Sequence, residues 1–170
     1  MLPPVLSTAR TTLRPFALGE AEALLALFQT PEVRRYLLDD TVVTLDWMRQ
    51  EIHTSTARFG DTGAGLWSVR DRATDALLGF AGFRPFFEPP QLQLLYGLHP
   101  DHWGGGLATE AAACVCTHAF AHLGFVEILA AVDRPNVASV HVLNRLGMVH
   151  THTTDDGEAG TLFFRLTSPR

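Results

Sequence analysis

The sequence predicts a single α/β (α+β) domain over residues 1–170, with a mixed central sheet of about seven strands and helices on both faces. Two observations support this prediction. The spacing of apolar residues changes between the helical period and the alternation of strands, in the order β, three helices, βββ, α, β, α, ββ. A length of 170 residues, with 46% hydrophobic and 18% charged residues, fits one well-packed core.

The first half of the chain predicts one strand followed by three helices. The strand alternates and ends at a proline, and the apolar residues then recur at helical spacing. Thr30, which precedes a proline, and Thr44 both have the pattern of helix N-caps. The predicted elements are a strand over residues 10–16 and helices over residues 18–28, about 31–38 and 45–58.

The second half predicts an antiparallel meander of three strands, then alternating helices and strands. The first of its helices is apolar on nearly every side and should be buried, and Asn136 and Gly147 bound the second as N-cap and C′ residue. Two final strands flank an acidic turn at residues 155–158. The predicted strands cover residues 66–70, 77–83, 92–98, 126–132, 148–153 and 160–166, and the helices cover residues 105–123 and 137–146.

The composition disfavours several classes of partner. A net charge of −5 disfavours nucleic acid, because phosphate-backbone binding needs clustered basic residues, and suits an amine substrate better. The sequence has no run of about 18 apolar residues that could span a bilayer, and residues 1–5 do not resemble a secretory leader. We therefore expect a cytoplasmic protein with no membrane partner.

The two cysteines, Cys114 and Cys116, fall within a predicted helix and point to different sides of it, so they cannot pair readily. His118 and His122 lie nearby at i,i+4 spacing, but on a different part of the helix from Cys116. We expect thiols that fill the core and no metal site.

Three consecutive glycines, Gly104 to Gly106, follow a predicted strand and lead into a predicted helix. Glycine lets backbone amides approach a ligand closely, and a helix N-terminus offers unpaired N–H groups and the positive end of the peptide dipole. The stretch therefore predicts an anion site, with phosphate as the expected ligand. By itself the same pattern is also typical of a plain loop that enters a helix.

Several separated segments of the sequence together form a recognisable pattern. The two most specific are residues 103–111 and 136–148, which lie about 25 positions apart, and weaker matches fall at residues 13–16, 78–83 and 96–100. With these segments the chain resembles the GCN5-related N-acetyltransferases (GNAT superfamily), and within them the RimJ/RimL-like branch of ribosomal-protein N-terminal acetyltransferases. The resemblance covers nearly the whole chain.

The resemblance implies acetyl-CoA as the acetyl-donor cosubstrate and no metal. Backbone amides of the glycine stretch would hold the pyrophosphate, and the strand that ends near Leu98 would carry the pantetheine arm. That arm would enter a wedge where the strands over residues 92–98 and 126–132 splay apart. The residues expected to hold the cofactor are Leu98, Trp103, Gly104, Gly105, Gly106, Leu107, Ala108, Thr109, Asn136 and Ser139.

The implied reaction is direct attack of a neutral amine on the thioester carbonyl. It needs a base or a water chain, donors for the oxyanion and an acid for the thiolate. The resemblance places the oxyanion near residues 98–100, where His99 is the candidate donor, and places Asn136 and Ser139 against the cofactor, with Ser139 as the candidate acid. The catalytic assignments are therefore Ser139, Asn136 and His99, although Asn136 also suits a helix cap and Ser139 also suits close helix packing.

Two departures from the superfamily pattern affect the catalytic assignments. Leu143 stands where many members carry a tyrosine acid, and Gln91 and Gln93 stand where related enzymes often carry glutamates. A glutamine cannot act as a general base. The remaining candidate bases are Glu88, His99 and His102, for each of which a solvated or packed role is the alternative.

The acceptor is what the sequence leaves open. A protein N-terminal amine and a small-molecule amine both fit, and an acetyltransferase acting on cationic antibiotics is a further reading, with Asp39, Asp40 and Glu88 as its acidic groups. A non-catalytic sensor of acyl-CoA is the alternative outside enzymes. Loops over residues 39–44 and 84–90 are expected to wall the acceptor site, where Phe86 and Phe87 suggest either an apolar contact or ordinary packing. A homodimer is also left open.

Overall fold

The computed structural model describes residues 2–155 and 159–169, and all strands of these residues join one sheet in the order β1-β2-β3-β4-β5-β6-β8-β7. Neighbouring strands are antiparallel except for β5 and β6, which are parallel, so the predicted mixed sheet is confirmed. The strands are β1 (Leu6–Ser7), β2 (Thr11–Pro15), β3 (Leu66–Asp71), β4 (Leu77–Phe86), β5 (Gln91–Leu98), β6 (Glu127–Asp133), β7 (Val149–Thr154) and β8 (Thr161–Thr167).

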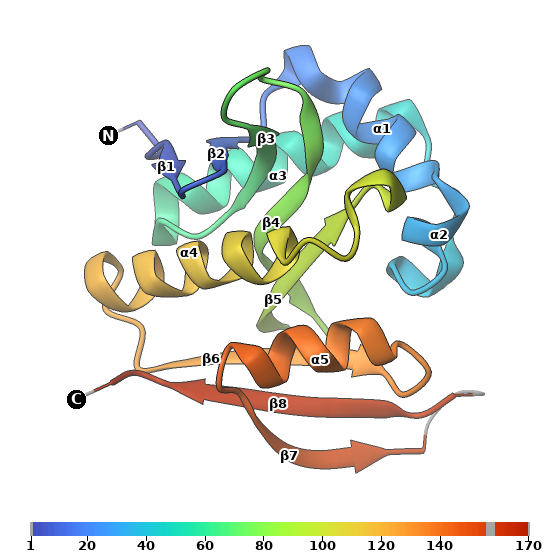
Figure 1. Cartoon of the computed structure of the whole chain (residues 1–170), viewed down its shortest axis with the longest axis vertical. Helices are drawn as coiled ribbons and strands as arrows, with labels where there is room; N and C mark the ends of the chain where they lie inside the picture. The colour runs from blue at the N-terminus through green and yellow to red at the C-terminus, as the bar shows by residue number, and fades with distance from the viewer. Residues whose placement is uncertain (1, 156–158, 170) are drawn as a thin grey trace.

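Helices cover both faces of this sheet, as the sequence predicts. One buried cluster joins Leu24, Met48 and Ile52 to Phe80 of the sheet, and a second joins Val115 and other residues of the later helices to the opposite face. In Figure 1 the early helices gather around β3 and β4, while the last helix lies beside β6 and β8. The helices are α1 (Ala21–Gln29), α2 (Pro31–Arg34), α3 (Leu45–Thr62), α4 (Leu107–His122) and α5 (Val137–Arg145), with 3-10 turns η1 (Leu18–Glu20), η2 (Leu38–Asp40) and η3 (Pro100–His102).

The structure differs from the sequence prediction at several element ends. β1 is an additional strand, too short at two residues for alternation to reveal it. Thr44 caps α3 by accepting from the backbone N–H of Trp47 at 3.1 Å, but the hydroxyl of Thr30 donates back to the carbonyl of Ala26 and does not cap α2. Helix α3 runs beyond residue 58 to Thr62, and its C-cap residue Gly63 has a left-handed φ of 74°. Residues 156–158 of the predicted acidic turn lie outside the described residues.

Helix α4 begins at Leu107, two residues later than predicted, because two of the glycines before it adopt left-handed backbone conformations. Gly104 has φ 82° and Gly106, the N-cap, has φ 80°. These conformations are strained for residues with a Cβ atom, so the glycines form a loop rather than a first helical turn. Within α4 both cysteines are unpaired. Cys116 is buried in the core as expected, whereas Cys114 is only half-buried and is not part of the core.

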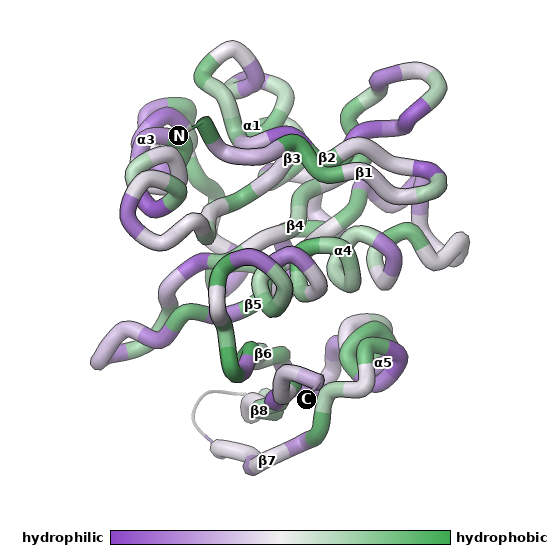
Figure 2. The backbone as a smooth tube through the Cα atoms, turned by 90° about the vertical axis from the view of Figure 1, so that its left-hand side faces the viewer, coloured by the Kyte–Doolittle hydropathy of each residue, from purple (hydrophilic) through white to green (hydrophobic). Residues whose placement is uncertain are grey.

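The sheet is divided between β5 and β6. Their parallel register is a single paired position, Gln93 opposite Leu129. Figure 2 shows β6, β7, β8 and α5 lying together, set apart from the strands that precede them. The divergence of β5 and β6 beyond Gln93 agrees with the wedge that the sequence resemblance implies, and it positions the site described below.

Gly79 on β4 is packed so closely against β5 that a side chain cannot be accommodated there. A Cβ atom at this position would collide with the carbonyl oxygen of Gly97 and with Leu98. We expect Gly79→Ala to lower the free energy of unfolding by about 1–3 kcal/mol, the usual effect of overpacking. Gly19→Ala, where no atom lies within 4 Å of the added Cβ, is the matched control. Equal urea midpoints for the two variants would contradict this packing.

Candidate functional site

A cavity of about 1210 Å³ opens where β5 and β6 diverge. Its wall is formed by β5, the end of β6, the start of α5, the loop before α4 and, on the other side, the segment from Pro31 to Asp39. The volume exceeds the roughly 300–1,000 Å³ typical of pockets for one small molecule. The cavity therefore has room for two ligands side by side.

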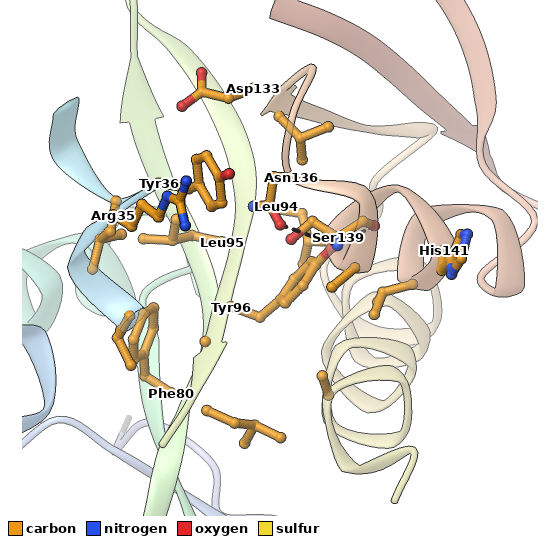
Figure 3. Close-up of a pocket in the computed structure, with 18 of the residues that line it drawn as sticks. Arg35, Tyr36, Phe80, Leu94, Leu95, Tyr96, Asp133, Asn136, Ser139 and His141 are labelled. Carbon is orange, nitrogen blue, oxygen red and sulfur yellow. Dashed lines mark hydrogen bonds between the residues drawn. The ribbon is translucent and has the colours of Figure 1, made fainter. Parts of the chain in front are cut away.

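The cavity reaches both faces of β5. Leu94 and Tyr96 belong to the core on the α4 face, whereas Leu95 packs with Phe80 against the core of α1 and α3. All four residues also line the cavity. Figure 3 shows the same division, with Tyr36 and Phe80 on one side of β5 and Ser139 on the other. A ligand on the α5 side can therefore meet a ligand from the α2 side through the gap.

The glycine loop ends at the N-terminus of α4, beside the cavity. The first helical bond of α4 runs from the Glu110 amide to the Gly106 carbonyl at 3.0 Å. The amides of Leu107, Ala108 and Thr109 precede it and have no intrahelical acceptor. No atom lies within 4 Å of a Cβ built on Gly104, so the space before the helix is open. Such a helix terminus attracts an anion.

Arg10 and Glu110 hold this loop in place through side-chain contacts. The guanidinium of Arg10 donates from Nη1 to the Gly105 carbonyl at 2.8 Å and contacts Oε2 of Glu110 with Nε and Nη2, both at 2.8 Å. Oε1 of Glu110 accepts from the Arg10 amide at 3.0 Å and from the Thr8 hydroxyl at 2.5 Å. The turn between β1 and β2 is thereby tied to the loop and to the first turn of α4.

Asn136 and Ser139 lie together on the cavity wall at the start of α5. The side-chain oxygen of Asn136 accepts from the Ser139 amide at 3.3 Å, so the predicted N-cap is confirmed. The hydroxyl of Tyr96, on β5, donates to the Ser139 carbonyl at 3.2 Å and links the two sides of the gap. Burial raises the pKa of Tyr96 to about 12, so this hydroxyl stays protonated. The sequence did not single out Tyr96, because a tyrosine in a strand is typical of ordinary core packing.

The predicted cofactor residues do not all reach the wall. Those that line the cavity are Leu98, Trp103, Gly104, Gly106, Leu107, Ala108, Thr109, Asn136 and Ser139. The Leu98 carbonyl already accepts from Trp103 Nε1 at 2.8 Å, and Gly105 is turned toward Arg10. Thr109 is notable because its hydroxyl is buried and has no hydrogen-bond partner among the described residues.

His99 is not part of the cavity wall, although the sequence places it among the catalytic residues. Its amide donates to the Leu78 carbonyl at 2.8 Å, and its Nδ1 accepts from the Asp101 amide at 3.2 Å. These bonds make His99 the cap of η3, and its backbone N–H is already engaged. Of the other candidate bases, His102 lies on the wall and Glu88 does not.

The α2 side of the cavity carries residues that the sequence only partly anticipated. Phe86, Phe87 and Asp39 line it as expected, whereas Asp40 pairs with Arg34 away from the wall. Asp133, the last residue of β6, also lies on the wall, and burial together with the carboxylate of Asp39 raises its pKa. A single acidic residue that ends an apolar strand was the signal available in the sequence.

Comparison with known proteins identifies the family. The model of the acetyltransferase (GNAT) domain matches residues 10–149. The chain belongs to the GNAT acetyltransferase family. It is 30% identical to the uncharacterized N-acetyltransferase YoaA of Bacillus subtilis over 85% of this chain and 82% of that protein. It is 26% identical to the FsC-acetyl coenzyme A-N(2)-transacetylase of Aspergillus fumigatus over 88% of this chain and 67% of that protein.

Solved structures of this GNAT family share the fold. A putative GnaT-family acetyltransferase from Bordetella pertussis has a TM-score of 0.83 at 21% identity, covering 95% of this chain and 98% of that one. RimL, a ribosomal L7/L12 alpha-N-protein acetyltransferase in complex with coenzyme A, has a TM-score of 0.82 at 12% identity, covering 96% and 98%. At these identities the likeness shows the fold alone. The shared fold agrees with the predicted RimJ/RimL-like branch.

As a member of this family the chain is an acyltransferase. GNAT acetyltransferases use acetyl-CoA, which agrees with the cosubstrate that the sequence predicts. Among the described residues no group of three or more His, Cys, Asp and Glu side chains could hold a metal ion. Within residues 2–155 and 159–169 no helix is both long and apolar enough to cross a membrane.

Removal of the Arg10 guanidinium should loosen the glycine loop. We expect Arg10→Ala to raise the Kd for coenzyme A about three- to tenfold while kcat at saturating donor changes little, because the loop lies away from the gap. Titration calorimetry and steady-state kinetics measure the two effects. Arg14→Ala removes an exposed pair with Asp75, which lies in the turn between β3 and β4, and serves as the control. An unchanged Kd in Arg10→Ala would show that the loop holds its shape without this contact.

The contacts of Glu110 also predict a pH dependence of stability. Partial burial raises the pKa of this carboxyl, but the bonds from Thr8 and Arg10 outweigh it and hold the pKa below its ordinary value of 4.5. The stabilisation is therefore complete above that value and is lost as the pH falls through the lower folded pKa. The free energy of unfolding of Glu110→Gln should lie below that of the wild type at pH 7, and the gap should narrow toward pH 3. Glu22→Gln, at an exposed position of α1, is the control.

Proposed function

We propose that this GNAT protein transfers the acetyl group of acetyl-CoA to an amine, by direct attack in a ternary complex. The observation that carries the proposal is the continuity of the cavity, from the N-terminus of α4 along β5 to the gap and then to the α2 side. A donor and an acceptor entering from opposite faces would meet where β5 and β6 diverge. Acetyl-CoA fits such a path with its phosphates at the N-terminus of α4 and its thioester at the gap.

In this proposal the pyrophosphate binds at the N-terminus of α4. Its partners are the amides of the loop and first turn, with the unpartnered hydroxyl of Thr109 as an additional donor. The pantetheine arm then follows β5 toward the gap, as an added strand would. Leu98 lines this path, but its carbonyl is engaged by Trp103, so other backbone groups of β5 are left to pair with the arm.

The chemistry proposed at the gap needs few groups. The neutral amine attacks the thioester carbonyl, the C–N bond forms, and the C–S bond breaks with its electron pair remaining on sulfur. Ser139 and Asn136 lie on the wall where the sulfur would sit, and the Ser139 hydroxyl is proposed to protonate the thiolate, directly or through water. Tyr96 is proposed to hold the Ser139 backbone in place. His99 is left out because it does not line the cavity, its amide is bonded to the Leu78 carbonyl and its Nδ1 to the Asp101 amide.

Ser139→Ala tests the proposed acid. We expect kcat to fall at least about tenfold while the Kd for coenzyme A changes little, since the hydroxyl acts on the leaving sulfur and not on the phosphates. Ser168→Ala, which alters a hydroxyl bonded to Pro169, is the control. An unaltered kcat in Ser139→Ala would assign this role to water.

Thiol release from acetyl-CoA in the presence of a panel of amines tests the function itself. Acetylated product with stoichiometric coenzyme A is the expected result. Tight binding of acetyl-CoA without thiol release on any amine would instead favour the non-catalytic sensor, to which the apolar and fully buried Leu143 lends some support. The cytoplasmic location, the single domain and the homodimer stay predictions.

A further inference from the structure

The α2 side of the cavity ends at an aromatic contact between the β4–β5 hairpin and β8. Phe87, in the turn that joins β4 to β5, lines the cavity, and its ring centroid lies 5.4 Å from that of Phe163 on β8, at an interplanar angle of 42°. The hairpin and β8 are not neighbours in the sheet, because β6 separates β5 from β8. The ring of Phe87 therefore reaches across from one half of the divided sheet to the other.

The cavity follows β6 and β8 as far as Phe87 and stops there. On one face of these two strands Asp133 is paired with Thr161. Ala131 and Phe163 form the next pair on the same face, because residues two apart in a strand share a face. Three of these four residues line the cavity, and Phe163 is the one that does not. The ring of Phe87 thus separates the cavity from the surface of β8 at Phe163, and its removal would extend the cavity over that surface.

The residues on both sides of this contact are held by further contacts. The ring of Phe163 is stacked on that of His152 on β7, with centroids 4.3 Å apart and an interplanar angle of 7°. On the hairpin, the guanidinium carbon of Arg84 lies 4.8 Å from the ring centroid of Phe86, and Nε of Arg84 donates to Glu51 of α3 at 3.0 Å. The hairpin arm is therefore fixed to α3 and Phe163 is fixed to β7, so the wall between them has a defined position.

Phe87 adopts a backbone conformation that favours glycine. Its φ of 72° lies in the left-handed region, which is unfavourable for a residue with a bulky side chain. The residue is also 48% exposed, so burial in the core does not account for its placement. Conformations of this kind persist where the surrounding structure holds them, and they cluster at ligand sites. The contact with Phe163 is what holds this ring at the edge of the cavity.

We propose that Phe87 sets the upper size of the acceptor, because its ring closes the α2 side of the cavity against Phe163 and excludes amines that extend farther. This inference rests on the proposed acetyl transfer and names a specificity-determining residue for it. An amine whose nitrogen lies at the gap and whose body stays within the cavity is accepted, whereas a longer rigid body meets the ring. Such a wall discriminates between acceptors by a clash and leaves the chemistry at the gap unchanged.

Two rigid amines of different length test this size limit. The probes are 2-phenylethylamine and 2-(biphenyl-4-yl)ethylamine, which is longer by one ring. We expect the wild type to have a kcat/KM at least about tenfold lower for the longer amine. Phe87→Gly should remove most of this difference by lowering the KM for the longer amine, with little change in kcat for the shorter one. Glycine suits a φ of 72°, so this variant removes the ring without adding backbone strain.

Two matched variants show whether the ring itself is responsible. Phe87→Leu keeps a branched apolar side chain at the same position and should retain most of the preference for the shorter amine. Val149→Ala, at an exposed position of β7, is the control and should behave as the wild type. Binding of coenzyme A by calorimetry accompanies every variant, and an unaltered Kd shows that the fold and the donor site are intact. A loss of affinity in Phe87→Gly moves the test to Phe87→Ala, with the same expected result.

Several outcomes contradict the size limit and leave the acetyltransferase intact. They are equal kcat/KM values for the two amines in the wild type, an unchanged ratio in the variant that lacks the ring, and a change of ratio carried by kcat alone. Failure of the wild type to acetylate either probe, while other amines of the panel are acetylated, contradicts it as well. Absence of turnover of every amine in the panel, with coenzyme A bound, overturns the proposed function instead.

Discussion

The single parallel pairing between β5 and β6 is the constraint on which the site depends. Hydrogen bonding between the two strands at Gln93 and Leu129 holds the sheet together, and its absence farther along opens the cavity. A fully paired sheet would leave no passage from one face to the other. Tyr96 and Ser139 bridge the opened part by a hydrogen bond from strand to helix, so the two halves stay in register while the gap remains.

The second requirement is a helix end that is open to solvent and rigid at once. Glycines with left-handed φ keep side chains away from the N-terminus of α4. The same freedom would leave the loop mobile without an external support. Arg10 and Glu110 supply that support, since one guanidinium binds both a loop carbonyl and a carboxylate of the first helical turn. An anion site of this kind combines backbone donors with a fixed geometry.

The two ends of the cavity differ in charge, which suits two different ligands. The α4 end offers backbone N–H groups and the positive end of a helix dipole, where an anion is stabilised. The α2 end offers Asp39 and Asp133 beside an aromatic wall, where a cation is stabilised. This polarity is consistent with a phosphate-bearing donor and an amine acceptor approaching from opposite sides.

Local pattern was sufficient for the order of elements, the glycine loop, the Asn136 cap and the family, because each depends on residues that are close in sequence. Tertiary structure alone decided that Arg10 reaches Gly105, that the His99 amide bonds to the Leu78 carbonyl, and that Asp133 shares a wall with Asp39. These contacts join residues of different elements, some about a hundred positions apart, and depend on strand order and on where pairing stops. The spacing of residues along the sequence records neither the strand order nor the end of the pairing. Most of the proposed donor site could therefore be predicted from the sequence, but only part of the proposed acceptor site, such as Asp39 and Phe86.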